Sequence, residues 1–189
     1  RNSSISNDMI NYHKNINIGL AVSVEDGLMV PVLKNCEEKN FLGICRSINT
    51  TAGRTREGVI GPEELSGSTF TVSNFGVFGV SMGTPIINQP NVGVLGVGAI
   101  KKQPVVVEVS GCDSIAIRSM MILTLGFDHR LIDGAGGSKF VESVKKNNAI
   151  LINQKSFESI LLIQSPLGLK FEEIDLFRFQ VVQLVLTLK

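Results

Sequence analysis

Alternating apolar and polar residues near the start of the chain predict a β-hairpin. Two segments rich in Val, Leu and Ile, Asn17–Ser23 (N-I-G-L-A-V-S) and Leu28–Lys34 (L-M-V-P-V-L-K), are separated by Asp26-Gly27, a favoured turn pair. Pro31 has no N–H to donate to a neighbouring strand, so the second segment is expected to lie at an edge or to bulge there.

A helix is predicted after this hairpin. Asn40 is a suitable N-cap, because its side chain can accept a hydrogen bond from a free N–H of the first turn. The apolar residues that follow recur at helical spacing on one face: Phe41, Ile44, Cys45 and Ile48. Pro62, within G-P-E-E-L, predicts one further short helical turn, because proline fits the first helical position.

Later apolar segments predict more strands. They are Ser68–Ser73, Asn91–Ile100, Val105–Val109 and Ser114–Arg118, the last two forming a hairpin across Ser110–Asp113. Gly96 and Gly98 share one face of their strand, which suits the close approach of another group. The continuous apolar run Ser119–Phe127 predicts a central strand buried on both faces.

A second helix is predicted from Gly134 to about Lys146. Asp133 is its expected N-cap and Asn147-Asn148 its expected stop. Its buried face is expected to contain Phe140, Val141 and Val144. Because strands outnumber helices and do not alternate regularly with them, the predicted fold class is α+β with a large mixed β-sheet.

Composition limits the functional classes. The chain has 189 residues, 43% of them hydrophobic, which is enough for one domain with a substantial core. A net charge of +1 gives no electrostatic reason to expect nucleic acid or an anionic membrane surface as a partner. No apolar run reaches the ~18 residues needed to span a bilayer. The chain starts at Arg1, so we expect it to be a fragment.

The cysteines and histidines do not form a metal-binding pattern. The three cysteines, Cys36, Cys45 and Cys112, contain no C-x-x-C pair, and the two histidines lie far apart. We therefore expect neither a disulfide framework nor a metal site, and we expect a reducing compartment.

The candidate chemistry is concentrated in Phe127–Gly134 (F-D-H-R-L-I-D-G). His129 lies between a predicted rigid strand and a predicted helix start, a position at which proton transfer is often built. The alternative is a structural loop histidine beside an ordinary Asp N-cap. Asp128 and Arg130 flank it and are expected to form ion pairs that fix the loop.

A second candidate region is rich in glycine. The segment N-F-G-V-F-G-V-S-M-G follows the predicted strand that ends at Ser73, and it is either a wall around a ligand or a plain loop between strands. It contains neither G-x-G-x-x-G nor a P-loop pattern, so no nucleotide site is predicted.

Five motifs in order carry a family resemblance. They are Y-H-K-N-I-N-I-G-L-A-V, D-G-L-M-V-P-V, G-S-T-F-T-V-S-N-F-G, T-P-I-I-N-Q-P-N-V-G-V-L-G-V-G and F-D-H-R-L-I-D-G-A, and they cover roughly Tyr12 to Ile152. Together they resemble the catalytic core of dihydrolipoamide acyltransferases, the E2 components of 2-oxo acid dehydrogenase complexes. The resemblance implies a chloramphenicol-acetyltransferase-like two-layer fold with flanking helices, and acyl transfer between dihydrolipoamide and coenzyme A.

The resemblance also implies roles for single residues. The catalytic histidine of the family falls on His129, which would act as general base on a thiol, and the hydroxyl that stabilises the tetrahedral oxyanion falls on Ser73. The motif aspartate falls on Asp133, which is grouped with the catalytic residues. It could hold the histidine loop electrostatically or simply cap the helix, and we favour capping. For coenzyme A the matching positions are Ser73, Asn74, Gly98 and Ile100. The serine and histidine are expected to come from different subunits.

The resemblance further implies an organisation and partners. Residues 1–152 are expected to be a partial catalytic domain with a frayed or displaced polar end at Arg1–His13, and residues 153–189 an unassigned apolar tail with a strand at Phe177–Leu188. The lipoyl group is expected on a separate domain that is not in this chain, as are the contacts to the E1 and E3 components. A homotrimer building a larger multimeric core is expected, in the cytoplasm or, in a eukaryote, the mitochondrial matrix.

Two other functions stay open. One is a non-catalytic scaffold subunit of the same complex, which would be expected to lack the histidine or the serine. The other is a free-standing acetyltransferase that modifies a small molecule. The acyl group is also open between acetyl, succinyl and branched-chain groups, with T-P-I-I-N-Q-P-N-V-G favouring the latter two.

Overall fold

The computed structural model describes the backbone of residues 2–152 and the side chains as far as residue 146. The expected tail at 153–189 and its strand lie outside the described residues. The elements are β1 (Ser3–Ser6), β2 (Met9–Tyr12), β3 (Ile18–Leu20), β4 (Val22–Val24), β5 (Gly27–Met29), β6 (Val32–Leu33), α1 (Phe41–Arg56), β7 (Phe70–Asn74), β8 (Gly93–Val97), β9 (Lys101–Val109), β10 (Cys112–Met120), β11 (Leu123–Phe127) and α2 (Gly134–Ile152). Three short 3-10 helices lie at Cys36–Glu38, Pro62–Glu64 and Gly76–Phe78.

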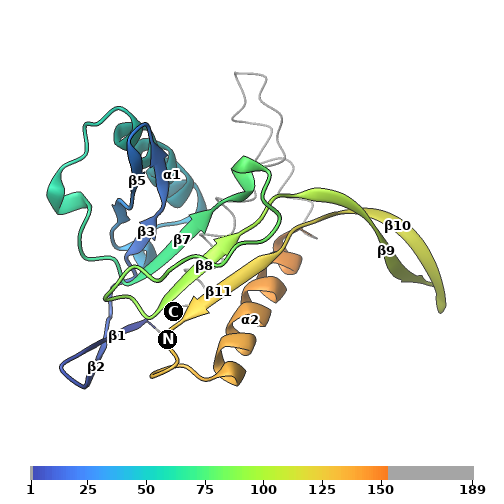
Figure 1. The fold of residues 1–189 in the computed structure, drawn as a ribbon. Helices are drawn as coiled ribbons and strands as arrows, with labels where there is room; N and C mark the ends of the chain where they lie inside the picture. The colour runs from blue at the N-terminus through green and yellow to red at the C-terminus, as the bar shows by residue number, and fades with distance from the viewer. Residues whose placement is uncertain (1, 153–189) are drawn as a thin grey trace.

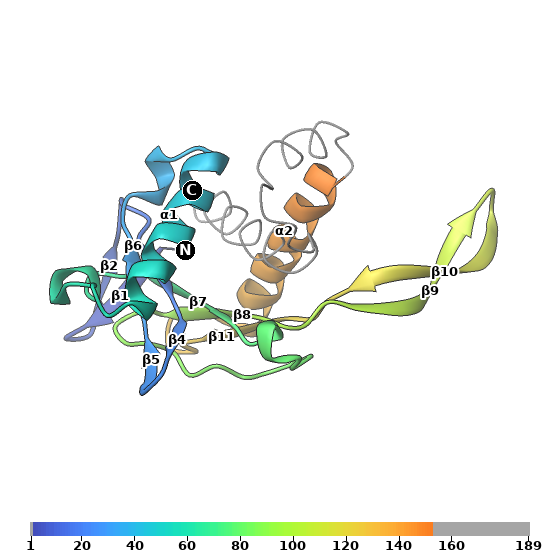
Figure 2. The same cartoon turned by 90° about the horizontal axis from the view of Figure 1, so that it is seen from above.

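A mixed five-stranded sheet in the order β11-β8-β7-β3-β6 forms the centre of the molecule (Figure 1). The pairs β3–β7 and β7–β8 are parallel, whereas β3–β6 and β8–β11 are antiparallel. Both helices lie on the same side of this sheet (Figure 2). The α+β class and the mixed sheet predicted from the sequence are therefore confirmed.

The core lies between the sheet and the helices. Ile44 of α1, Val72 of β7 and Leu95 of β8 are each at most 1% exposed, and burying such a side chain contributes about 1.5–3 kcal/mol. Asn40 caps α1 as predicted, since its Oδ1 accepts a hydrogen bond of 2.8 Å from the Gly43 N–H. Ile44 and Ile48 form the buried face that the helical spacing predicted.

Strand β8, rather than the segment before His129, is the fully buried strand. All five of its residues are buried, whereas the residues of β11 are half-buried and β11 lies at the edge of the sheet. The prediction of a central strand at Ser119–Phe127 was wrong. The apolar run is divided between two strands, because Ser119 belongs to β10 and only Leu123–Phe127 forms β11. Strand order is set by pairing with distant segments, which an apolar run does not reveal.

Three further predictions of local structure need correction. The hairpin turn consists of Glu25-Asp26, because Val24 pairs with Gly27. The segment expected to be a frayed end instead forms the antiparallel pair β1–β2, and Ser3 is fully buried. Helix α2 continues through residues 147–148 to Ile152, because asparagine is only mildly unfavourable within a helix.

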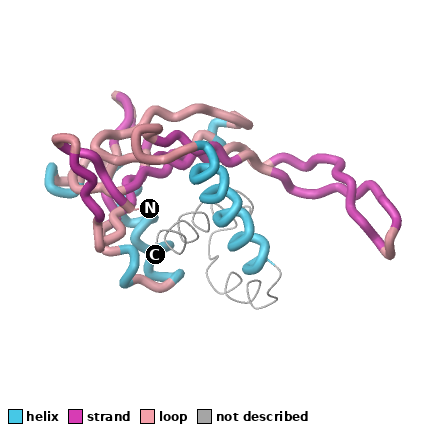
Figure 3. Tube along the Cα trace, turned by 90° about the horizontal axis from the view of Figure 1, so that it is seen from below, coloured by secondary structure: helices cyan, strands magenta, loops and turns pink. Residues whose placement is uncertain are grey.

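The hairpin β9–β10 projects far beyond the sheet, as the views from above and below both show (Figures 2 and 3). Its strands are longer than predicted and pair over nine residues each. Several of its apolar side chains are exposed, among them Val106, Ile115 and Ile117. An isolated two-stranded hairpin is marginally stable in water, so this arm is suited to contact another protein surface.

Candidate functional site

The loop after β11 holds His129 by backbone hydrogen bonds around its neighbour Asp128. The Asp128 N–H donates to the Val92 carbonyl at 2.9 Å, and the Asp128 carbonyl accepts from the N–H groups of Leu131 and Ile132, both at 3.0 Å. His129 itself is exposed, and its ring centroid lies 5.5 Å from that of Phe127. The histidine is thus presented to solvent on a constrained turn.

Asp128 and Arg130 form the predicted ion pair across the histidine. Arg130 Nη2 lies 2.6 Å from Asp128 Oδ2, and Arg130 Nε donates to Asp128 Oδ1 at 3.0 Å. These hydrogen bonds hold the pKa of the Asp128 carboxyl below its usual range. The side chain of Arg130 is 70% exposed, so solvent screens the pair and its main effect is to fix the loop.

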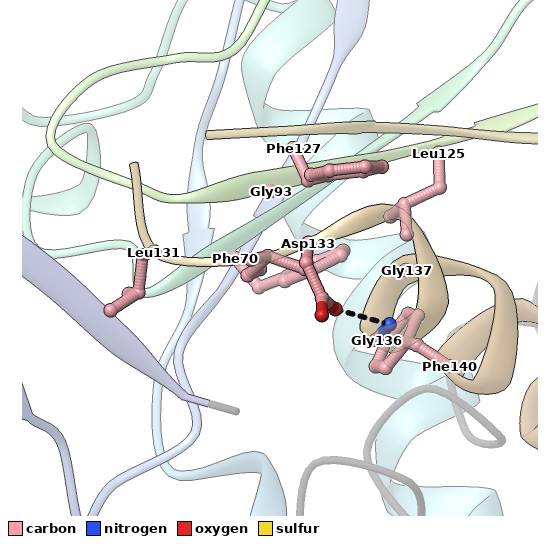
Figure 4. Close-up of a pocket in the computed structure, with 10 residues that line it drawn as sticks. Phe70, Gly93, Leu125, Phe127, Leu131, Asp133, Gly136, Gly137 and Phe140 are labelled. Atoms are coloured by element: carbon pink, nitrogen blue, oxygen red, sulfur yellow. Dashed lines mark hydrogen bonds between the residues drawn. The ribbon is translucent and has the colours of Figure 1, made fainter. Parts of the chain in front are cut away.

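Asp133 caps α2 as predicted. Its Oδ1 accepts a hydrogen bond of 2.6 Å from the Gly136 N–H, drawn as the dashed line in Figure 4. A carboxylate at this position satisfies a free N–H and interacts favourably with the positive end of the helix dipole. The cap fixes where α2 begins, and thereby where the turn that holds His129 ends.

A cavity of about 480 Å³ lies beneath this loop, between the sheet and the start of α2. Phe70, Phe127 and Phe140 line it, and the rings of Phe70 and Phe140 are 5.6 Å apart (Figure 4). Asp133 is the only ionisable side chain among the described residues that line it. The cavity is therefore mainly apolar and separate from the exposed imidazole.

Ser73 lies at the other end of the sheet. It is half-buried on β7 and pairs with Gly96 of β8, which in turn pairs with Thr124 of β11. Phe127 is three strand positions beyond Thr124, which places the two residues about 10 Å apart at ~3.3 Å per residue. His129 lies two residues further along the chain. One chain therefore does not bring Ser73 and His129 together.

A second cavity, of about 500 Å³, lies beside Ser73 and is called the Ser73 cavity below. Segments of α1, β3, β4, β5 and β7 line it. Its neutral polar side chains, Ser23, Asn49, Ser73 and Asn74, lie among apolar ones such as Phe78. Asn74 Oδ1 accepts from the Gly76 N–H at 3.0 Å, which fixes the turn after β7. An apolar cavity with a few fixed polar groups is typical of a small-molecule site.

Sequence reasoning did not single out the charged side chain of the Ser73 cavity. Arg56 lines it, together with Ile48 and Ala52. The signal was available, because residues spaced four apart on a helix share a face and Arg56 continues the face of Ile48 and Ala52.

The two other residues matched to coenzyme A do not line the Ser73 cavity. A Cβ on Gly98 would lie 2.0 Å from the Ser81 carbonyl oxygen, so the chain's own loop approaches closely there. Gly96 likewise faces the ring of Phe75. Ile100 is half-buried beyond the end of β8. The glycines thus accommodate the loop after β7, which covers the sheet face opposite the helices.

Two further findings bear on function. Within residues 2–152, no three His, Cys, Asp or Glu side chains are grouped so that they could hold a metal ion. In the same part of the chain, no helix has the length and apolar character needed to cross a membrane.

The chain is similar to known proteins over most of its described length. The family model of the 2-oxoacid dehydrogenases acyltransferase (catalytic domain) matches residues 1–151. An acetyltransferase component of the pyruvate dehydrogenase complex of Corynebacterium glutamicum is 41% identical over 134 residues, which are 71% of this chain and 20% of that protein. A succinyltransferase component of the 2-oxoglutarate dehydrogenase complex of Haemophilus influenzae is 41% identical over 77% of this chain and 34% of its own length.

Solved structures agree with the sequence matches. A probable dihydrolipoamide acetyltransferase of Listeria monocytogenes superposes with a TM-score of 0.68 at 41% identity, covering 75% of this chain and 58% of that one. The cubic core of a pyruvate dehydrogenase multienzyme complex gives 0.68 at 35% identity, covering 75% of this chain and 57% of that one. The chain spans about a fifth to a third of the curated relatives' length. It belongs to the 2-oxoacid dehydrogenase acyltransferase family, whose catalytic-domain model it matches.

Proposed function

We propose that this chain supplies catalytic residues for transfer of an acyl group between dihydrolipoamide and coenzyme A. The observation that carries the proposal is His129, which is exposed on a turn fixed by Asp128 and Asp133 in a chain that matches the catalytic domain. Acetyl- and succinyltransferases are both among the relatives at 41% identity, so the similarity supports the reaction class and does not choose the acyl group.

The chemistry assigns a role to the imidazole of His129. A thiol with a pKa of ~8.5 is only a few per cent thiolate at neutral pH, and a neutral imidazole can remove its proton as it attacks. The sulfur then bonds to the thioester carbonyl carbon, and the carbonyl oxygen becomes an oxyanion. When the intermediate collapses, the other carbon–sulfur bond breaks and the imidazolium returns the proton to the departing thiolate.

Ser73 would donate a hydrogen bond to that oxyanion, and one such donor contributes about 3 kcal/mol to the transition state. Because Ser73 and His129 lie at opposite ends of the sheet, the site requires two copies of the chain. The cubic core among the structural neighbours supports a larger assembly, for which we propose homotrimers as the unit. The exposed apolar side chains of the β9–β10 hairpin offer a surface for such contacts.

Asp133 caps α2 and also lies close in sequence to His129. In the study of the Azotobacter vinelandii acetyltransferase, a serine, a histidine and an asparagine four positions after that histidine are addressed for their role in catalysis. Asp133 occupies the corresponding spacing after His129. We propose that Asp133 acts mainly by ending the turn that presents His129, through its bond to the Gly136 N–H.

The Ser73 cavity fits the pantetheine arm of coenzyme A. The arm is narrow and partly apolar, and the cavity combines apolar walls with the polar groups of Ser73 and Asn74. Gly98 and Ile100 lie outside this cavity, and their contact with coenzyme A stays a prediction. The lipoyl group and the contacts to the E1 and E3 components would lie on other domains, and a cytoplasmic location stays a prediction.

The test is acyl transfer to coenzyme A from acetyl-, succinyl- and isobutyryl-dihydrolipoamide, with the protein and its His129→Ala variant. We expect one donor to dominate and the variant to lose at least ~100-fold in kcat. A protein that assembles into large particles but is inert with all three donors would instead be a scaffold subunit. Activity towards small hydroxyl compounds alone would indicate the free-standing acetyltransferase.

A further inference from the structure

The Ser73 cavity contains one charged side chain. Among the described residues that line it, Arg56 alone is ionisable, and the others are apolar or neutral and polar. Arg56 ends α1 and is exposed, so its guanidinium lies where the cavity meets solvent. Ser73 and Asn74 line the same cavity. A molecule that fills it would meet neutral hydroxyl and amide groups and a single cation.

Arg54, two residues earlier, has a structural role at the end of this helix. Its Nη1 lies 2.6 Å from Glu64 Oε1, and its Nη2 donates to Glu64 Oε2 at 2.8 Å. It also donates to the Val59 carbonyl at 3.1 Å, and the hydrogen bonds with Glu64 raise the pKa of the Arg54 guanidinium. Arg54 therefore fastens the end of α1 to the turn at Pro62–Glu64.

Arg56 has a different situation. Within residues 2–146 its guanidinium makes no hydrogen bond or ion pair, although its neighbour Arg54 makes several. Residues two apart on a helix point to different sides, which separates the two arginines. An unpaired guanidinium that continues the cavity face of Ile48 and Ala52 is available for an anionic ligand.

We propose that Arg56 is a positioning residue that binds a phosphate group of coenzyme A. The inference rests on the proposed function, since it assigns the acceptor thiol to the Ser73 cavity. Coenzyme A has its reacting thiol at one end and its phosphates at the other, so a cation at the mouth matches a thiol placed near Ser73. A guanidinium suits this task because its planar donors pair with two phosphate oxygens at once.

The test compares two acceptor thiols that differ only in the nucleotide part. Coenzyme A and pantetheine are used as acceptors with wild type, Arg56→Gln, Arg56→Lys and Arg54→Gln, and kcat/KM is measured for each. We expect Arg56→Gln to lower the ratio of coenzyme A to pantetheine by about 10- to 100-fold, as for one hydrogen bond to a charged group. The loss should appear in KM, shrink at high salt and be partly restored in Arg56→Lys.

The control variant separates position from charge. Arg54→Gln removes an equal charge two residues away and breaks the contact with Glu64, so it should lower stability and leave the acceptor ratio unchanged. The proposal is overturned if Arg56→Gln affects both acceptors equally, or affects neither. It is also overturned if the loss follows succinyl rather than acetyl donors, because Arg56 would then bind the acyl carboxylate.

A direct measurement of coenzyme A binding tests the role of Arg56 independently of the proposed reaction. Calorimetric titration of coenzyme A into wild type and Arg56→Gln should show the same 10- to 100-fold weakening without any turnover. If the protein transfers no acyl group but binds coenzyme A through Arg56, the proposed function fails and the Arg56 assignment stands. If the protein transfers acyl groups and Arg56→Gln binds coenzyme A as tightly as wild type, only the Arg56 assignment fails.

Discussion

The two ends of the five-stranded sheet hold their candidate catalytic side chains by different means. Ser73 belongs to a strand paired on both sides, next to the fully buried Val72. His129 follows an edge strand and depends on its own loop, through the hydrogen bonds of Asp128 and the cap at Asp133. The serine end is therefore fixed by the core, whereas the histidine end is fixed locally and can be altered without unfolding the domain.

The largest effect is expected at the histidine end. His129→Ala should reduce kcat by ~10²–10⁴-fold, because the general base is removed, while the free energy of unfolding changes little for an exposed side chain. Steady-state kinetics and urea denaturation measure the two quantities. The control is His13→Ala, which removes the other histidine and its 2.9 Å hydrogen bond to Ser4 Oγ. Equal losses of activity in both variants would contradict the role of His129.

At the serine end, Ser73→Ala should lower kcat by about 10²–10³-fold through loss of the oxyanion donor. Thr71→Val on the same strand is the matched control. This substitution removes the Thr71 Oγ1 acceptor, to which Asn91 Nδ2 donates at 2.7 Å. The loss should lower the free energy of unfolding by about 1–3 kcal/mol, and activity per folded molecule should be retained. If Ser73→Ala behaved like the control, Ser73 would be structural.

Much of the local structure could be predicted from the sequence. The caps at Asn40 and Asp133 depend on neighbours three residues away, so local residue types sufficed. The β1–β2 pair was missed, although its turn residues Asn7 and Asp8, both with positive φ, are typical of a hairpin.

The arrangement of the sheet was not available from local patterns. The edge position of β11 and the register of Ser73 against Gly96 depend on pairing between segments tens of residues apart. The expectation that serine and histidine act from different subunits came only from the family resemblance. Their separation within one chain is the physical reason that supports it.

A smaller effect should distinguish the two interpretations of Gly98. Gly98→Ala would place a Cβ 2.0 Å from the Ser81 carbonyl oxygen and should cost about 1–3 kcal/mol, measured by urea denaturation. Gly53→Ala is the control, because no atom lies within 4 Å of its added Cβ and alanine favours helix by about 0.5–1 kcal/mol. A stable Gly98→Ala variant with weakened coenzyme A binding would show that the glycine serves the ligand instead.

The smallest effect is expected from the ion pair beside His129. Arg130 lowers the pKa of Asp128, so the pair stabilises the fold above the unfolded pKa of Asp128 and loses this contribution as the pH falls through the lower folded value. Arg130→Ala should raise the Asp128 pKa towards its usual range, which NMR titration can follow. Its stability should converge with that of wild type below about pH 4. A stability difference that persisted in acid would have another cause.

The most direct test of the account is to mix two inactive variants. Ser73→Ala and His129→Ala subunits are dissociated, combined in equal amounts, reassembled, and assayed for acyl transfer. If each site takes its serine and its histidine from different copies in a closed ring, random mixing should restore about a quarter of wild-type activity. Activity no higher than that of the separately reassembled variants would contradict a site shared between copies.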